Sequence, residues 1–90
     1  MASYVKGPNE TLDYTVDWSD SLTPVSDTIS TSTWTVEDGL TLTSNSNTST
    51  TATAWLSGGE PGRTYAATNK IVTAGNRTFE KTIYIQVEVI

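Results

Sequence analysis

Regular alternation of apolar and polar residues is the feature that most constrains how this chain folds. It is clearest near the carboxyl terminus, where Ile83, Ile85 and Val87 share one parity and mostly polar residues hold the other. Successive side chains of a β-strand point to opposite faces, so a period of two predicts strands with one buried face. Thr accounts for 18 and Ser for 10 of the 90 residues, and β-branched Thr suits a half-exposed sheet better than a helix. The chain is predicted to be all β.

Similar runs between turn residues predict the remaining strands. The predicted strands are 12–18, 28–36, 40–44, 50–56, 64–73 and 77–89, with the last two forming a hairpin around residues 74–76. Ile29 and Trp34 lie on opposite parities within one run, which predicts a bulge or a strand that changes sheets. Residues 44–49 are all Ser, Asn or Thr and are interpreted as a polar loop. No helix is expected, because no window shows helical spacing of apolar residues.

Short strands at regular spacing favour one antiparallel, immunoglobulin-like β-sandwich of about six or seven strands. A small barrel stays open as an alternative, because the pattern specifies buried faces and not closure. The sandwich is predicted to span residues 10–90, after a flexible amino-terminal arm at residues 1–9. The predicted core consists of Leu12, Tyr14, Val16, Trp18, Trp34, Val36, Leu40, Leu42, Ala54, Leu56, Tyr65, Ile71, Phe79, Ile83, Ile85 and Val87.

Composition excludes most kinds of chemistry. Cys and His are both absent, which removes disulfides, thiolate nucleophiles, imidazole bases and most transition-metal sites. With 10 acidic and 5 basic residues the formal charge is -5, which argues against nucleic acid or an anionic membrane as the partner. No segment has the roughly 18 apolar residues of a membrane span or the pattern of a secretory leader. We therefore expect no enzymatic activity, no cofactor and no metal.

Two residue clusters suggest a small-ligand site, and each has a simpler structural interpretation. Asp17 and Asp20 would form a calcium site with loop oxygens, but the Asp-x-Asp-x-Asp pattern is missing. A solvated strand face that ends in an Asx turn explains these residues better. The Gly-rich segment 57–62 with Arg63 resembles an anion-binding loop, but a phosphate cradle needs a helix amino terminus behind it. This segment is interpreted as a loop between strands.

Exposed aromatic residues are the best candidates for binding that composition offers. Trp55 has the opposite parity to Ala54 and Leu56, so its side chain is predicted to point outward. Three Trp and four Tyr would suit a carbohydrate-stacking platform. In a sandwich of this size, however, Trp more often supplies core volume or anchors an interface.

Several longer segments are similar to one protein family. Residues 12–20 read LDYTVDWSD, residues 27–36 read DTISTSTWTV, and residues 55–59 read WLSGG, followed by residues 62–69 and by Arg77 beyond the turn. In this order and spacing they resemble a family of small tailed-bacteriophage virion proteins. Its members are usually described as fibre-tail adaptors or other structural proteins with an immunoglobulin-like sandwich. The resemblance covers nearly the whole chain, from about residue 6 to residue 89.

This resemblance implies a non-enzymatic virion protein that is made in the host cytoplasm and is oligomeric within the particle. An adaptor would link the tail or collar to the fibres through strand edges and aromatic side chains. A capsid cement or decoration protein on the outer shell is one alternative, and a carbohydrate-binding module is another, from a different class. The partners expected are tail, collar, fibre or capsid proteins. The residues predicted to form the interface are Tyr4, Trp55, Arg63 and Tyr84.

Overall fold

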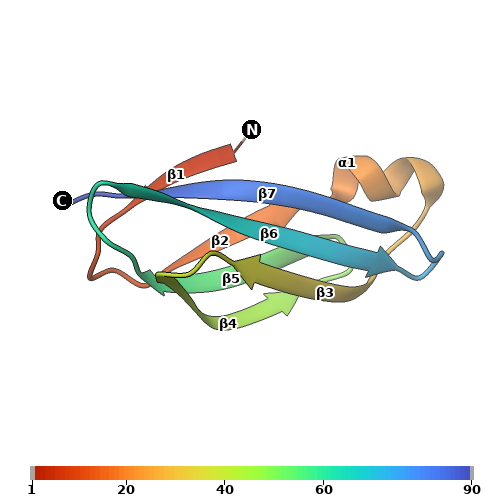
Figure 1. Ribbon diagram of the computed structural model, residues 1–90. Coiled ribbons are helices and arrows are strands. Elements are labelled where there is room, and N and C mark those ends of the chain that lie inside the picture. Colours follow the sequence, from red (N-terminus) through yellow and green to blue (C-terminus); the bar gives the residue numbers. More distant parts are fainter. Residues whose placement is uncertain (1, 90) are drawn as a thin grey trace.

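Two sheets make up the protein, whose computed structural model describes residues 2–89. The strands within this range are β1 (Ala2–Lys6), β2 (Leu12–Asp17), β3 (Ile29–Val36), β4 (Leu40–Asn47), β5 (Thr51–Gly58), β6 (Arg63–Thr73) and β7 (Thr78–Val87). One sheet has the order β1-β7-β6-β3 and the other the order β2-β5-β4 (Figure 1). The prediction of an all-β sandwich is confirmed, and the barrel alternative is wrong because the sheets stay separate.

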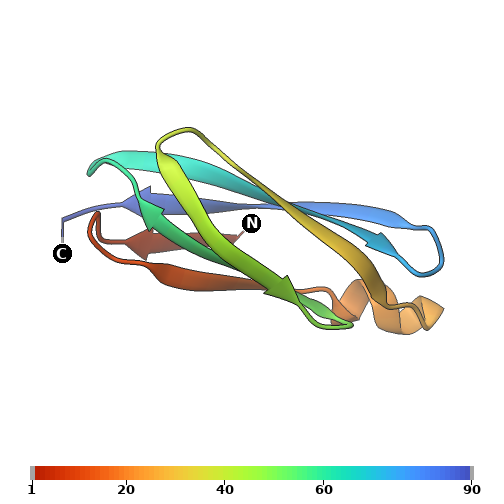
Figure 2. The same cartoon turned by 90° about the horizontal axis from the view of Figure 1, so that it is seen from below.

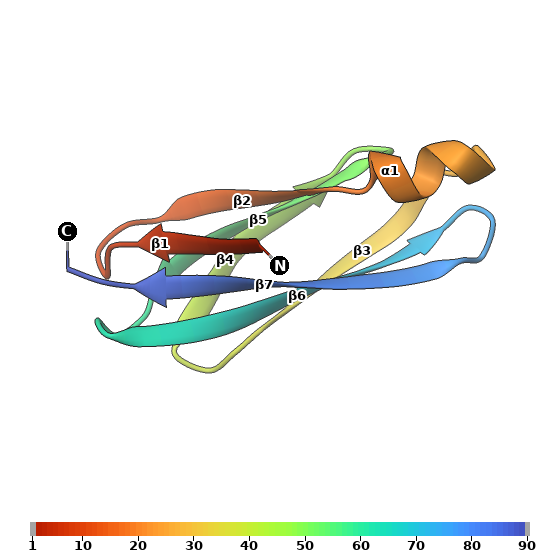
Figure 3. The ribbon, with the colours of Figure 1, turned by 90° about the horizontal axis from the view of Figure 1, so that it is seen from above.

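Strand order follows the immunoglobulin pattern except at the first strand. Immunoglobulin constant domains have the orders A-B-E-D and C-F-G. Counted along the chain, β2-β5-β4 corresponds to B-E-D and β7-β6-β3 corresponds to G-F-C. The first strand leaves its usual sheet, because β1 pairs in parallel with β7. In Figure 3, β1 lies between β2 and β7.

Two aromatic residues occupy positions typical of this fold. Trp34 is buried on β3, and the hydroxyl of Tyr65 accepts a hydrogen bond of 2.9 Å from the N–H of Glu60. Such a tyrosine corner at the start of strand F ties the preceding loop to the core. A Cβ on Gly39 would lie 2.7 Å from the Tyr65 ring, and one on Gly59 would lie 3.3 Å from it. The ring therefore leaves no room for a Cβ at residue 39 and only a tight contact for one at residue 59.

The core follows the alternation closely. Every residue predicted for the core is buried or packs against the buried cluster. A buried polar contact inside this core was not predicted: Trp18 Nε1 donates to Asn69 Oδ1 at 2.9 Å, and Asn69 Nδ2 donates to Ser32 Oγ at 2.9 Å. These hydrogen bonds join β3 and β6 to the residue that follows β2, so they help to fix how the two sheets face each other.

The prediction of no helix is wrong after β2. One turn of α-helix, α1 (Ser19–Leu22), leads into a short 3₁₀ helix, η1 (Thr23–Val25). The N–H of Leu22 donates to the carbonyl of Trp18 at 3.0 Å, its side chain is fully buried, and Pro24 lies in the first turn of η1. A single turn is too short to leave a helical period in the sequence, so the apolar pattern gives no signal of it.

Residues 2–6 lie in the four-stranded sheet. The sequence, in contrast, predicts an arm at residues 1–9 before a domain that starts at residue 10. Ala2–Lys6 runs in register with residues 83–87 of β7, and the N–H of Glu88 donates to the carbonyl of Lys6 at 3.0 Å. The apolar Tyr4 and Val5 are adjacent, so this segment shows no period of two, which is why the strand was not predicted. Residues 1 and 90, the outer ends of the two predicted ranges, lie outside the described residues.

Bulges interrupt two edge strands, β3 and β4, which lie at the front of Figure 2. The register of β3 shifts between Ile29 and Thr31, which confirms the predicted bulge. The register of β4 shifts between Leu42 and Ser44, and β4 continues to Asn47. The predicted polar loop is therefore wrong over residues 45–47, because pairing with β5 satisfies the backbone of this polar second half of β4. The other two edge strands, β1 and β2, pair without a register shift.

Candidate functional site

Trp55 lies on the outer face of the three-stranded sheet, as the parity predicts. Its neighbours Ala54 and Leu56 on β5 are fully buried, whereas Trp55 is 41% exposed. It pairs across the sheet with Asp13 on β2 and with Ser44 on β4. Because β5 is the central strand, this ring stands in the middle of a polar face.

Tyr4 lies at the open side of the sandwich. It belongs to β1, and its ring centroid is 4.9 Å from that of Tyr14 on β2, so the two rings bridge the gap between the sheets. Tyr4 is 36% exposed, whereas the hydroxyl of Tyr14 is buried without a hydrogen-bond partner among the described residues. Burial raises the pKa of Tyr14, and the nearby Glu10, Tyr4 and Asp13 raise it further.

Tyr84 and Arg63 lie elsewhere on the four-stranded sheet. Tyr84 alternates with the buried Ile83 and Ile85 of β7, so it points to the outer face of its own sheet. Arg63 begins β6, and its guanidinium lies 5.9 Å from the ring centroid of Tyr65. The four predicted interface residues therefore do not form one patch. They occupy both outer faces, one open side and one end of the sandwich.

The backbone of β1 offers a free edge that residue types alone could not reveal. The carbonyl of Lys6 accepts the N–H of Glu88, so the backbone groups of Lys6 point toward β7. N–H and C=O groups alternate in direction along a strand, and those of Ser3 and Val5 therefore point to the opposite side. Val5 is also 54% exposed. β1 thus presents unpaired backbone groups beside exposed side chains.

A buried ammonium closes one end of the molecule. Lys6 is fully buried, and its Nζ donates hydrogen bonds of 2.6 Å to the carbonyls of Gly7 and Gly58. Burial lowers the pKa of Lys6, and the nearby carboxylate of Glu10 partly opposes this effect. The contact with Gly58 joins the end of β1 to the end of β5. A shallow depression beside this end is lined by Gly7, Pro8, Asn9, Glu10 and Val89.

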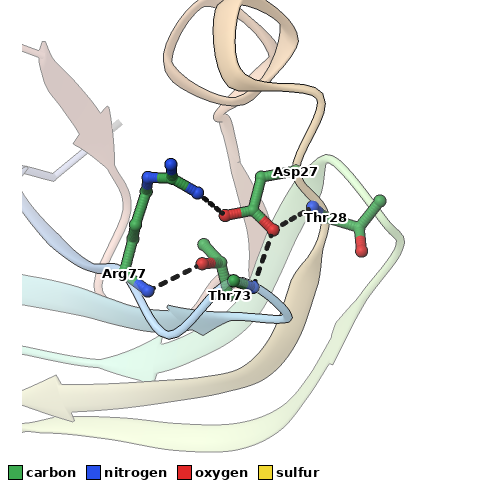
Figure 4. A network of polar contacts seen from close by, with 5 residues as sticks. Asp27, Thr28, Thr73 and Arg77 are labelled. Carbon is green, nitrogen blue, oxygen red and sulfur yellow. Dashed lines mark hydrogen bonds and ion pairs between the residues drawn. The ribbon is translucent and has the colours of Figure 1, made fainter.

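A buried carboxylate closes the other end (Figure 4). The Asp27 side chain is 4% exposed and pairs with the guanidinium of Arg77 at 2.9 Å. It also accepts the N–H groups of Thr28 at 2.9 Å and of Gly75 at 3.0 Å. A hydrogen bond from the Thr73 hydroxyl, together with these N–H groups and Arg77, lowers the pKa of Asp27 to about 2 against the opposing effect of burial. This network ties the start of β3 to the β6–β7 turn.

Both clusters considered as small-ligand sites have structural roles. Asp17 Oδ1 accepts the N–H of Ser19 at 2.9 Å, which is the expected Asx turn and lowers the pKa of Asp17. Segment 57–62 joins the end of β5 to β6, as predicted. Within residues 2–89 no group of three acidic side chains is placed to hold a metal ion. None of the helices in that range is long and apolar enough to cross a membrane.

Comparison with known proteins identifies the family of the chain. Residues 6–86 match the family model described as podophage GP4 fiber-tail adaptor protein gp77. The chain belongs to this fibre-tail adaptor family. No curated protein matches the chain in sequence. Family membership makes it a phage virion component with a structural adaptor role, which confirms the resemblance found in the sequence.

Three of the four predicted interface residues lie within the range that matches the adaptor family. Trp55, Arg63 and Tyr84 fall inside residues 6–86, whereas Tyr4 precedes them. The matched range begins at Lys6, the last residue of β1. Most of the β1 edge therefore lies outside the part of the chain that the adaptor family model describes.

Lys6 and Asp27 were missed by reasoning from the sequence of this adaptor. A lone Lys before Gly-Pro and a lone Asp in a Ser- and Thr-rich loop carry no pattern. Their partners are 52 and 50 residues away in sequence, so only the fold brings them together. Gly58 and Arg77 gave a weak signal in that each stands beside a predicted turn.

Proposed function

We propose that the chain is a non-enzymatic adaptor that joins the fibres of a phage particle to its tail or collar. The observation that carries this proposal is the match to the fibre-tail adaptor family, which extends over residues 6–86. Membership of a family of structural proteins supports a role without catalysis. The partners are other virion proteins, and the protein is made in the host cytoplasm and repeats with the symmetry of the particle.

Contacts of this adaptor use the β1 edge and the exposed aromatic side chains. A partner segment in extended conformation adds to β1 by hydrogen bonds to the backbone of Ser3 and Val5, as in other cases of β-strand addition. Tyr4 stands beside that edge, so its ring packs against the same segment. Trp55, Arg63 and Tyr84 serve contacts on other surfaces, in keeping with a unit that touches more than one neighbour.

Density of the intact particle, with the copies of this chain counted, tests the role. An adaptor is expected at the junction of fibre and tail or collar, in at most tens of copies that follow the tail symmetry. Location on the outer capsid shell in hundreds of copies would overturn the proposal in favour of a capsid decoration protein.

A single substitution tests the use of the β1 edge. Val5→Pro removes an N–H that points away from β7, so it blocks strand addition without breaking the β1–β7 ladder. Val5→Thr is the matched control, since it keeps the N–H and the branched side chain. Particles assembled with Val5→Pro are expected to lose the adaptor or the fibres, whereas Val5→Thr particles keep both. Equal incorporation of the two variants, with equal melting temperatures, contradicts this use of the edge.

A further inference from the structure

Charge is distributed unequally between the two sheets. The strands β2, β5 and β4 carry Asp13 and Asp17 and no basic residue. All basic residues of the chain lie in the four-stranded sheet or its β6–β7 turn, namely Lys6, Arg63, Lys70, Arg77 and Lys81. The outer face of the three-stranded sheet therefore has a negative potential that no cation on its own strands offsets.

Trp55 on the central strand and Asp13 on the edge strand β2 stand side by side on this face. They are directly opposite each other in the β2–β5 register, where Cβ atoms lie about 4.5–5.5 Å apart. Neither ion pair among the described residues involves Asp13. The nearest pair of hydroxyls along the same strands, Thr15 and Thr53, is satisfied internally by a hydrogen bond of 2.9 Å. An exposed indole beside an unpaired carboxylate is thus the distinctive feature of this face.

Arginine has the chemistry that this pair of side chains can bind. A guanidinium is planar, so it stacks on an indole ring while its N–H groups donate to a carboxylate beside the ring. Resting on the adaptor function proposed above, we propose that the outer face of β2-β5-β4 binds a partner virion protein through an arginine side chain. The guanidinium stacks on Trp55 and pairs with Asp13, and Asp17 adds to the attraction at longer range.

Two other occupants fit this face less well. A second copy of the chain would have to supply its own arginine, but Arg77 pairs with Asp27 at 2.9 Å and Arg63 lies over the Tyr65 ring. A neutral glycan would stack on Trp55 but would gain nothing from the negative charge of the face. The unequal distribution of charge therefore favours a cationic partner protein.

Titration of the isotope-labelled full chain with the capped peptide acetyl-Gly-Arg-Gly-amide tests the inference by NMR. The indole N–H signal of Trp55, assigned from its loss in Trp55→Phe, is expected to shift saturably. Asp13→Asn is expected to weaken binding about threefold to tenfold, and added salt should weaken it as well. Glu80→Gln, which removes one carboxylate from the other sheet, is the matched control and should leave the affinity unchanged.

Three results would overturn the inference. An equal response to the citrulline peptide, which keeps the shape but lacks the charge, would show that the cation is not recognised. A shift caused by cello- or malto-oligosaccharides but not by the arginine peptide would assign the face to glycans. A shift that depends on protein concentration alone would assign it to a second copy of the chain.

This experiment separates the inference from the proposed function. If the arginine peptide fails to bind while particle density places the chain at the fibre-tail junction, the adaptor function stands and the inference falls. If the peptide binds as expected while density places the chain on the capsid shell, arginine binding by this face stands and the adaptor function falls. The two measurements share no step.

Discussion

The two ends of the sandwich each bury one charged side chain, and they stabilise it in different ways. At the end that holds α1 and the β6–β7 turn, Asp27 is paired with Arg77 and accepts backbone N–H groups. At the opposite end, Lys6 donates to two carbonyls, and no carboxylate pairs with it among the described residues. Each side chain joins segments about 50 residues apart in sequence.

The difference shows that burial disfavours the charged form of both side chains, and that their partners decide whether the net pKa shift follows or opposes this effect. N–H donors and a guanidinium favour the ionised form of Asp27, so its pKa is lowered. Carbonyl dipoles do not compensate Lys6 to the same extent, so desolvation lowers its pKa and disfavours its charged form. The Asp27 end therefore depends on its charge, whereas the Lys6 end depends more on packing.

Substitutions in the core between the two ends are expected to cause the largest loss of unfolding free energy. Trp34→Ala is expected to cost about 3–5 kcal/mol of unfolding free energy, because it removes a buried ring from the core. Urea denaturation of the purified chain measures this loss. Trp55→Ala is the matched control and should leave stability nearly unchanged, since its ring is exposed. Equal losses in both variants would contradict the division between core and surface tryptophans.

A glycine-to-alanine substitution in the turn at each end tests whether the added Cβ meets a packed apolar side chain or polar side-chain ends. Gly59→Ala is expected to cost about 2–4 kcal/mol, because its Cβ would lie 2.6 Å from Val87 Cγ2 at a φ of +96°. Gly75→Ala should cost less, about 1–2 kcal/mol, because its Cβ would meet the side-chain ends of Arg77 at 2.7 Å and Asp27 at 2.9 Å and would loosen their ion pair. Thermal unfolding compares the two variants. A larger loss of stability for Gly75→Ala than for Gly59→Ala would contradict the expectation that the Lys6 end is the more tightly packed of the two.

Two substitutions of Lys6 test whether its stem or its charge stabilises that end. Lys6→Ala removes the buried stem and is expected to cost about 2 kcal/mol. Lys6→Met keeps most of that volume without the charge, so it should cost at most about 1 kcal/mol. Chemical denaturation at neutral pH measures both. If Lys6→Met is as destabilising as Lys6→Ala, the ammonium and its two carbonyls matter more than the packing.

Acid should weaken the Asp27 end first. The folded pKa of about 2 lies below the ordinary value of 3.8, so the stability from this group is complete above about pH 4 and is lost as the pH falls through 2. Asp27→Asn should therefore unfold with a flatter dependence on pH between 4 and 2 than the parent chain. Melting temperatures recorded across that range give the comparison. Parallel curves for the two proteins would show that Asp27 is not the titrating group.

Alkali should produce the smallest effect, at the Lys6 end. Because the folded pKa of Lys6 lies below 10.5, the unfolded chain holds more protons between the two values, and stability gains slightly as the pH rises through this window. Lys6→Met should lack that gain. Melting temperatures between pH 8 and 10.5 in matched buffers provide the readout, with Lys81→Met as a control on an exposed lysine. Identical profiles for Lys6→Met and the parent chain would exclude Lys6 as the source.

Alternation of apolar residues was enough to predict the sandwich and most of its core, but not the buried Leu22, Ile29, Ala52 and Ala67. Buried residues such as Ile83 and Ile85 show the period directly, and the mixed parity of Ile29 and Trp34 marked a bulge correctly. Leu22 was missed because one helical turn has no period to detect. The predicted strand at residues 40–44 was too short because the second half of β4 is entirely polar, and a polar segment resembles a loop until its pairing partner is known.

The candidate site was less predictable than the fold. Parity alone placed Trp55 on the outside, and this prediction is confirmed by its exposure. No pattern in the sequence could show that Asp13 would stand directly opposite it, because the β2–β5 register depends on the whole sheet. The role of Tyr4, Trp55, Arg63 and Tyr84 in an interface stays a prediction, and the structure adds only that they lie on separate surfaces.

The paired bulges in β3 and β4 have a consequence for assembly. Both interrupted strands lie on the side of the sandwich opposite the regular edges of β1 and β2. A kinked edge is a poor template for another strand, so a four-stranded sheet that is extended at β1 has no regular strand at its other edge, β3, from which to continue. Within that sheet the molecule accepts an added strand on one side only, which disfavours runaway extension of the same sheet through successive copies of this Thr-rich sandwich.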